Sequence, residues 1–283
     1  MQIYPLETGN FKLDGGAMFG VVPKSLWSRT NPPDEMNMCS WSMRCMLIED
    51  SNRLILFDTG IGDKQSEKFF SYYYLFGDDT LMGSLKKLGY SPDDITDVVL
   101  THLHFDHCGG AVERSDENKL RPVFKNATSW STEKHWEWAT NPNPREKASF
   151  LKENILPLQE SGQLKFVERS GDFTKNVFPN IDMLFVDGHT ESQMIPHLKY
   201  KGEKLVFMAD LLPSVGHIPL PYVMGYDTRP LLTLNEKEKF LKKAADEGYI
   251  LFLEHDYQNE CCTLQHTEKG VRLKDVFKFS DLF

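Results

Sequence analysis

The chain has 283 residues and a formal net charge of −9, and its 40% hydrophobic and 26% charged residues are typical of a globular protein. The acidic balance argues against a nucleic-acid partner, because such proteins usually carry a basic face. No apolar run is long enough to span a membrane, and the first residues lack the basic and apolar regions of a signal peptide. We therefore expect a cytoplasmic protein with five reduced cysteines and no membrane partner.

Short strands and helices alternate along the chain. Strands are expected at residues 44–50, 53–60, 98–100, 165–168, 183–186, 194–200, 204–209 and 249–253. Helices are expected at residues 79–88, 131–140, 146–156 and 235–247, the last one capped by Asn235 and ended by Gly248. Because no linker rich in proline, glycine or serine interrupts this alternation, we interpret residues 1–283 as a single α/β domain.

Histidine and aspartate side chains follow four of these strands, where α/β folds collect their functional residues. The set comprises His102, His104, Asp106, His107, His189, Asp210 and His255. Imidazole and carboxylate groups are ligands that Zn²⁺, Mn²⁺ and Fe²⁺ accept. Alternating residues of an extended turn face the same way, so His102 and His104 can bind one metal while Asp106 and His107 face another. The pattern predicts two divalent metal ions, with zinc as the first expectation and manganese or iron as options.

These motifs resemble those of a known family. THLHFDHCGG, followed in order by DGHT, MADLL and LEHD, resembles the metallo-β-lactamase superfamily over residues 44–256, and FDTGIG with Asp58 matches an early motif. The N-terminal DGGAMFGVVPKSLW is similar to the subgroup of quorum-quenching N-acyl homoserine lactonases and methyl parathion hydrolase-like enzymes. The resemblance implies a four-layer αββα sandwich.

The resemblance also implies a role for each motif residue. His102, His104 and His189 would hold the first metal, Asp106, His107 and His255 the second, and Asp210 would bridge both, while Asp58 would orient a ligand histidine. A hydroxide between the metals would attack the substrate. Asp106 and Asp210 would be the catalytic carboxylates, with Asp106 passing a proton to the leaving alkoxide.

Three features narrow the activity. His104 stands where redox members with two irons usually have glutamate, and Asp210 is present although many true β-lactamases lack it. The stretch after His255 is too short for the helical substrate domain of glyoxalase-II-like thioesterases. These features favour a hydrolase that opens a small-molecule lactone or ester. An organophosphate or aryl-ester hydrolase, a thioester hydrolase, a redox enzyme and a non-catalytic metal-binding sensor remain as alternatives.

Substrate contacts are less determined by the sequence. Well-known acyl-homoserine lactonases place a tyrosine three residues after the bridging aspartate, where this chain has Pro213, so Tyr222 or Tyr226 would have to replace it. Aromatic residues outside the motifs either line an apolar pocket or pack helices and a dimer contact. The candidate pocket residues are Met18, Phe19, Phe69, Trp130, His217 and Tyr222. The resemblance leaves a homodimer open.

Overall fold

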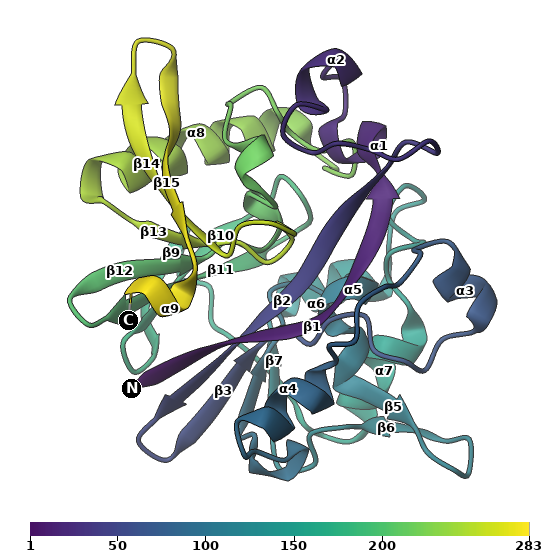
Figure 1. Cartoon of the computed structure of the whole chain (residues 1–283). Helices are drawn as coiled ribbons and strands as arrows, with labels where there is room; N and C mark the ends of the chain where they lie inside the picture. Colours follow the sequence, from purple (N-terminus) through teal and green to yellow (C-terminus); the bar gives the residue numbers. More distant parts are fainter. Residues whose placement is uncertain (283) are drawn as a thin grey trace. The chain divides into compact units, whose positions relative to one another are not determined.

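The computed structural model of the chain describes residues 1–282 (Figure 1). The chain divides into two compact units: the first contains Met1–Asn10 and Met43–Arg169, and the second contains Phe11–Ser42 and the chain from Ser170 onward. The early boundaries fall inside two long strands, β1 (Gln2–Asp14) and β2 (Met38–Asp50). The interpretation of residues 1–283 as one domain stays a prediction.

The first unit is built on a sheet in which β3, β4, β7 and β8 are parallel neighbours. These strands are β3 (Arg53–Phe57), β4 (Asp97–Val99), β7 (Thr128–Ser131) and β8 (Leu164–Phe166), and β5 (Val112–Arg114) and β6 (Leu120–Pro122) form a small separate sheet. The strands predicted at 44–50 and 53–60 correspond to the second half of β2 and to β3, which pair antiparallel with Asp50 opposite Arg53. All of β4 is buried, as expected for an inner parallel strand.

The helices of the first unit are α3 (Glu67–Ser71), α4 (Leu81–Lys87), α5 (Phe105–Cys108), α6 (Glu133–Thr140) and α7 (Lys152–Glu160). The predicted helices at 79–88 and 131–140 correspond to α4 and α6, which Thr80 and Thr132 cap through their side chains. The helix predicted at 146–156 is misplaced, since α7 begins only at Lys152. Glu146 lies instead in a turn where its N–H donates to the Asn143 side chain.

The second unit contains a seven-stranded sheet in the order β15-β14-β13-β12-β11-β10-β9. Its strands are β9 (Phe173–Phe178), β10 (Ile181–Val186), β11 (Gln193–Tyr200), β12 (Glu203–Phe207), β13 (Ile250–Phe252), β14 (Cys261–Thr267) and β15 (Gly270–Phe277). The predicted strands at 183–186, 194–200, 204–209 and 249–253 correspond to β10, β11, β12 and β13, although β12 ends at Phe207, two residues before the predicted end. The hairpin of β14 and β15 was not predicted.

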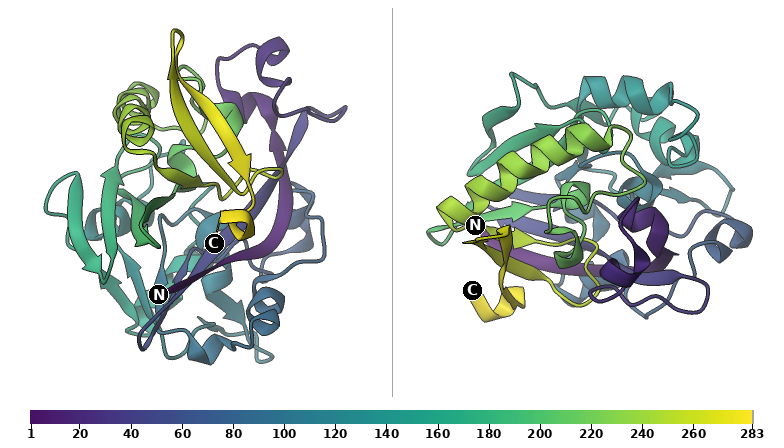
Figure 2. Two further views of the ribbon diagram at one scale, coloured as in Figure 1. Left: turned by 60° about the vertical axis from the view of Figure 1, so that its left-hand side comes forward. Right: turned by 90° about the horizontal axis from the view of Figure 1, so that it is seen from above.

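Helices α1 (Gly15–Phe19), α2 (Lys24–Trp27), α8 (Pro230–Glu247) and α9 (Phe279–Leu282) complete the second unit. Figure 2 shows α8 nearly end-on in one view and lengthwise in the other. The predicted cap at Asn235 is wrong, because α8 begins at Pro230, whose fixed φ suits the first turn of a helix. Gly248 ends this helix with φ 65°, as predicted. Among residues 1–282, no helix combines the length and hydropathy needed to cross a membrane.

Candidate metal centre

Four predicted ligands, His102, His104, Asp106 and His107, lie in the first unit and are here called the first half-site. They follow β4 directly, and all four are buried. Asp58, just after β3, fixes the start of this loop by accepting bonds from the N–H and the hydroxyl of Thr101 at 2.7 and 2.6 Å. The chain then turns into the short helix α5, so one stretch of backbone presents all four side chains.

Each histidine of the first half-site is held through one ring nitrogen. His107 Nδ1 lies 3.0 Å from Asp58 Oδ2, and His104 Nε2 lies 3.0 Å from Glu146 Oε1. His102 Nδ1 lies 3.1 Å from the Thr101 hydroxyl, whose proton already goes to Asp58, so the imidazole is the donor. Metal-binding histidines typically have their second nitrogen fixed in this way.

The opposite ring nitrogens form two pairs with neighbouring ligand atoms. His102 Nε2 and His104 Nδ1 are 3.0 Å apart, and His107 Nε2 lies 3.8 Å from Asp106 Oδ2. These are the pairs that the sequence assigned to the first and to the second metal. The assignment of these two pairs to two different metals stays a prediction.

The second half-site consists of His189, Asp210 and His255 in the second unit. They follow β10, β12 and β13, and all three are buried. The two oxygens of Asp210 face different histidines: Oδ2 lies 3.1 Å from His189 Nε2, and Oδ1 lies 3.0 Å from His255 Nε2. One carboxylate thus joins the two imidazoles, which is the arrangement that a bridging ligand needs.

Outer partners again fix both histidines of the second half-site. His189 Nδ1 lies 3.0 Å from Asp227 Oδ1, and His255 Nδ1 donates to the carbonyl of Ser42 at 2.8 Å. Burial alone would lower the pKa of His189, but the carboxylates of Asp210 and Asp227 outweigh it and raise the pKa to about 10. This half-site therefore attracts positive charge.

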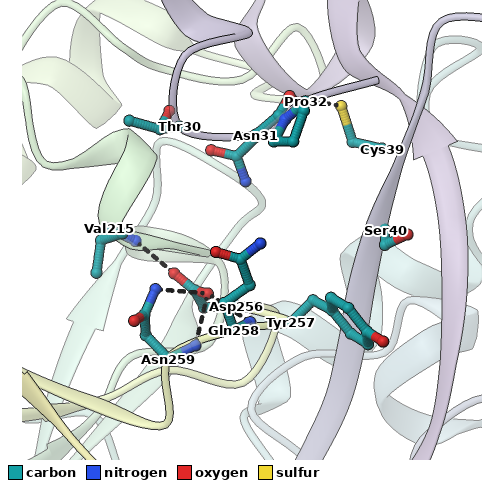
Figure 3. A pocket seen from close by; sticks show the side chains of 10 residues that line it. All are labelled: Thr30, Asn31, Pro32, Cys39, Ser40, Val215, Asp256, Tyr257, Gln258 and Asn259. Atoms are coloured by element: carbon teal, nitrogen blue, oxygen red, sulfur yellow. Dashed lines mark hydrogen bonds between the residues drawn. The ribbon is translucent and has the colours of Figure 1, made fainter. Parts of the chain in front are cut away.

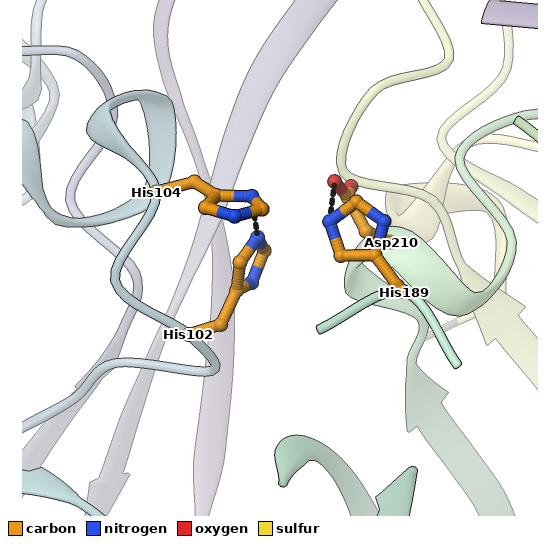
Figure 4. Close-up of side chains that lie close together, drawn as sticks. All are labelled: His102, His104, His189 and Asp210. Atoms are coloured by element: carbon orange, nitrogen blue, oxygen red, sulfur yellow. Dashed lines mark hydrogen bonds and ion pairs between the residues drawn. The ribbon is translucent and has the colours of Figure 1, made fainter. Parts of the chain in front are cut away.

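Figure 4 draws His102 with His104 and His189 with Asp210, together with the contact inside each pair. The chemistry of the two half-sites fits divalent metal ions, since buried imidazole nitrogens and carboxylate oxygens are the atoms that zinc binds. Glu146 and Asp227 were not predicted, because neither belongs to a motif. Both lie far along the chain from the histidine that they contact.

A small polar pocket of about 130 Å³ adjoins the segment after His255 in the second unit (Figure 3). Asp256 is the one charged side chain among its ten lining residues. Its carboxylate accepts bonds from the N–H groups of Val215, Gln258 and Asn259 at 2.9–3.0 Å. Asp256 therefore stabilises the turn that follows His255.

Four predicted pocket residues, Met18, Phe19, His217 and Tyr222, lie together in the second unit. Phe19 stacks on His217 with ring centroids 4.3 Å apart, and His217 Nε2 donates to the Met18 carbonyl at 2.9 Å. Burial lowers the pKa of His217 to about 3, so the imidazole is neutral. Tyr222 meets the edge of Phe19 and is partly exposed. Their contact with a substrate stays a prediction.

The other two predicted pocket residues, Phe69 and Trp130, belong to the first unit. Phe69 on α3 packs against Tyr73 and Phe105, with ring centroids 5.0 and 5.4 Å away. Trp130 on β7 donates its indole N–H to Asp97, which begins β4, whereas the metal ligands follow the other end of that strand. Nothing in this contact supports a pocket role for Trp130. The pocket roles of Phe69 and Trp130 stay predictions.

The succession of ligands at strand ends defines a class of protein. The chain belongs to the metallo-beta-lactamase superfamily, whose sequence profile matches residues 44–255. An N-acyl homoserine lactonase from Bacillus thuringiensis is 26% identical over 249 residues, which cover 83% of this chain and 88% of the relative. The protein is accordingly a metal-dependent hydrolase, as predicted.

Solved structures agree with this assignment. A probable metal-dependent hydrolase from Staphylococcus aureus has a TM-score of 0.86 and 28% identity, covering 98% of this chain and 96% of that one. A dizinc quorum-quenching lactonase in complex with a product has a TM-score of 0.78 and 22% identity, covering 98% and 95%. These neighbours confirm the predicted α/β sandwich of the metallo-β-lactamase fold.

Proposed function

We propose that the protein opens a small-molecule lactone or ester with two divalent metal ions held jointly by the two half-sites. The observation that carries this proposal is the Asp210 carboxylate, which offers one oxygen toward His189 and the other toward His255. The two ligand pairs of the first half-site support it, because each pair suits one metal. Lactonase relatives support a lactone as the substrate, and the dizinc neighbour supports zinc.

In this proposal His102, His104 and His189 would hold the first metal, Asp106, His107 and His255 would hold the second, and Asp210 would contribute to both. Bound metals of this kind lower the pKa of water to about 7 and polarise a substrate carbonyl. Asp58, Asp227 and the Ser42 carbonyl keep the ligand histidines oriented. Water would add to the substrate carbonyl carbon as the bond to the leaving alkoxide breaks, and Asp106 would carry the proton released by that water to the alkoxide. The cytoplasmic location and the homodimer stay predictions.

The test is hydrolysis of a panel of lactones, aryl esters, phosphotriesters and thioesters by zinc-loaded and by metal-stripped protein. We expect lactone turnover that metal removal abolishes and zinc restores. His104→Ala should lose the first metal and turnover together. His266→Ala is the matched control, because His266 is exposed and pairs only with Asp246 on the surface. Full lactone activity of His104→Ala protein that lacks the first metal would overturn the mechanism. Metal binding by wild type without hydrolysis of any panel member would favour the sensor.

A further inference from the structure

The segment of residues 132–150 comprises α6 with its cap and the turns that precede α7. It contacts the first half-site at two points. His135 Nε2 accepts the N–H of Leu103 at 2.8 Å, between the ligands His102 and His104. Glu146 Oε1 lies 3.0 Å from His104 Nε2. One segment outside the metal motif therefore holds both the backbone between the two histidines and the ring of one of them.

Glu146 is itself fixed before it meets His104. Its carboxylate is buried, with the residue 3% exposed, and Oε2 accepts bonds from Trp138 Nε1 at 2.7 Å and from Asn143 Nδ2 at 3.0 Å. Both of these donors are neutral. A buried carboxylate gains most from a donor that can share positive charge, and the imidazole of His104 is such a donor.

This contact decides which nitrogen of His104 carries the proton. A carboxylate accepts, so Nε2 holds the hydrogen and Nδ1 keeps its lone pair on the side of His102 Nε2. His102 is arranged the other way, because its Nδ1 donates to Thr101. The two histidines thus point different ring nitrogens toward each other, and Glu146 fixes the orientation of the second one.

We propose that Glu146 is a positioning residue that holds His104 in the tautomer with Nδ1 as the ligand atom and so sets the affinity of the first metal position. The proposal rests on the proposed function, since it takes His104 as a metal ligand. The effect is selective, because Glu146 contacts His104 whereas the ring of His107, assigned to the second metal, is held by Asp58. Loss of Glu146 should therefore weaken one metal position and spare the other.

The experiment titrates zinc into metal-stripped wild-type protein, Glu146→Gln and Glu137→Gln against a chromophoric chelator. Glu137→Gln is the matched control, since it makes the same change on the exposed face of α6. We expect wild type and Glu137→Gln to bind two zinc ions alike, and Glu146→Gln to bind one of them about 10–100-fold more weakly. Nitrogen chemical shifts of the histidine rings in metal-free protein should show that His104 loses its fixed tautomer in Glu146→Gln.

A milder variant covers the case in which Glu146→Gln does not fold. Trp138→Phe keeps an aromatic ring but removes the donor to Glu146 Oε2. We therefore expect the affinity for one zinc ion to fall, by less than in Glu146→Gln. Unaltered affinities at both positions together with an unaltered His104 tautomer would overturn the role of Glu146, while lactone hydrolysis by wild type would leave the proposed function standing. Wild-type protein that binds no zinc would overturn both proposals.

Discussion

The two half-sites reach the same chemistry by different routes. In the first, the four ligands lie within residues 102–107, on one loop after one strand. In the second, the three ligands lie at 189, 210 and 255 and follow three strands, β10, β12 and β13. The first half-site depends on the conformation of a single loop, whereas the second depends on the assembly of a sheet.

The two half-sites also differ in what sets the spacing between their ligands. Neighbouring positions in the loop set the spacing of His102 and His104, and distant carboxylates only orient the rings. In the second half-site no two ligands are neighbours in sequence, and Asp210 makes the contact that joins His189 to His255. Removing Asp210 should therefore affect both metals, whereas removing His102 should affect one.

The largest expected effect comes from replacing a ligand in each half-site. Asp210→Ala should remove both metals, because it deletes the shared carboxylate, and lower kcat/KM by more than about 10³-fold, beyond the loss from one transition-state hydrogen bond. His102→Ala should remove one metal and retain the other. Elemental analysis of the purified variants together with lactone kinetics checks this. Equal metal content in the two variants would contradict the comparison.

Replacing the outer carboxylates should have a smaller effect of similar size in both half-sites. Asp58 and Asp227 each lie 3.0 Å from a histidine Nδ1, one in each unit. Asp58→Asn and Asp227→Asn should each weaken metal binding by about 10–100-fold, because the ring loses a charged partner that orients it. Asp246→Asn is the control, since its histidine partner is on the surface. A variant with wild-type zinc affinity would show that its carboxylate only supports folding.

The first half-site could be predicted from the sequence, because its four ligands lie within six consecutive residues. The motif from His102 to His107 placed four candidate ligands on one loop, where the structure has all four buried. The dispersed residues His189, Asp210 and His255 could be chosen only because each follows a predicted strand and matches a family motif. Glu146 and Asp227 carry no such signal, since their role exists only once distant segments fold together.

The predicted starts of two helices were wrong where two local sequence signals for a helix end or a turn lay close together. Asn235 looked like a helix cap, but Pro230 starts α8 earlier, and Asn235 lies inside the helix. The predicted helix at 146–156 overlooked Asn143, whose side chain accepts the N–H of Glu146 and holds a turn there. The strands β14 and β15 were missed, because only Cys261, Cys262 and Leu264 among their side chains are buried and the two strands lack a continuous apolar run. Tertiary contacts decide such segments, and a single sequence does not display them.

One glycine beside each half-site allows the effect of an added side chain on folding stability to be compared. A Cβ added to Gly109 would lie closer than 3.0 Å to the backbone of Ile61, and one added to Gly188 would lie as close to the backbone of Thr233. Backbone cannot yield as a flexible side chain does, so Gly109→Ala and Gly188→Ala should each destabilise by about 1–3 kcal/mol. Gln159→Ala is the control, because Gln159 is exposed on α7. Chemical denaturation of metal-free protein measures the loss, and wild-type stability of either variant would show that its segment relaxes freely.

The smallest expected effect concerns a lysine buried in the second unit. Lys237 on α8 is 1% exposed and donates to the carbonyls of Pro219 and Tyr222 at 3.0 and 2.7 Å. Burial lowers its pKa from 10.5 to about 7. Above pH 7 the unfolded chain therefore binds more protons at this residue than the folded protein does, so the free energy of unfolding contributed by Lys237 rises with pH, by about 1 kcal/mol from pH 7 to pH 8.

Lys237→Met keeps the aliphatic chain but has no proton to lose, so the slope of the unfolding free energy against pH in that interval should be lower than in wild type by about 1 kcal/mol per pH unit. Lys239→Met, on the exposed face of the same helix, should keep the wild-type slope. Urea unfolding of metal-free protein at pH 7.0, 7.5 and 8.0 measures all three slopes. The same slope in Lys237→Met as in wild type would mean that the lysine stays charged when buried, with the two carbonyls supporting the ammonium in place of water.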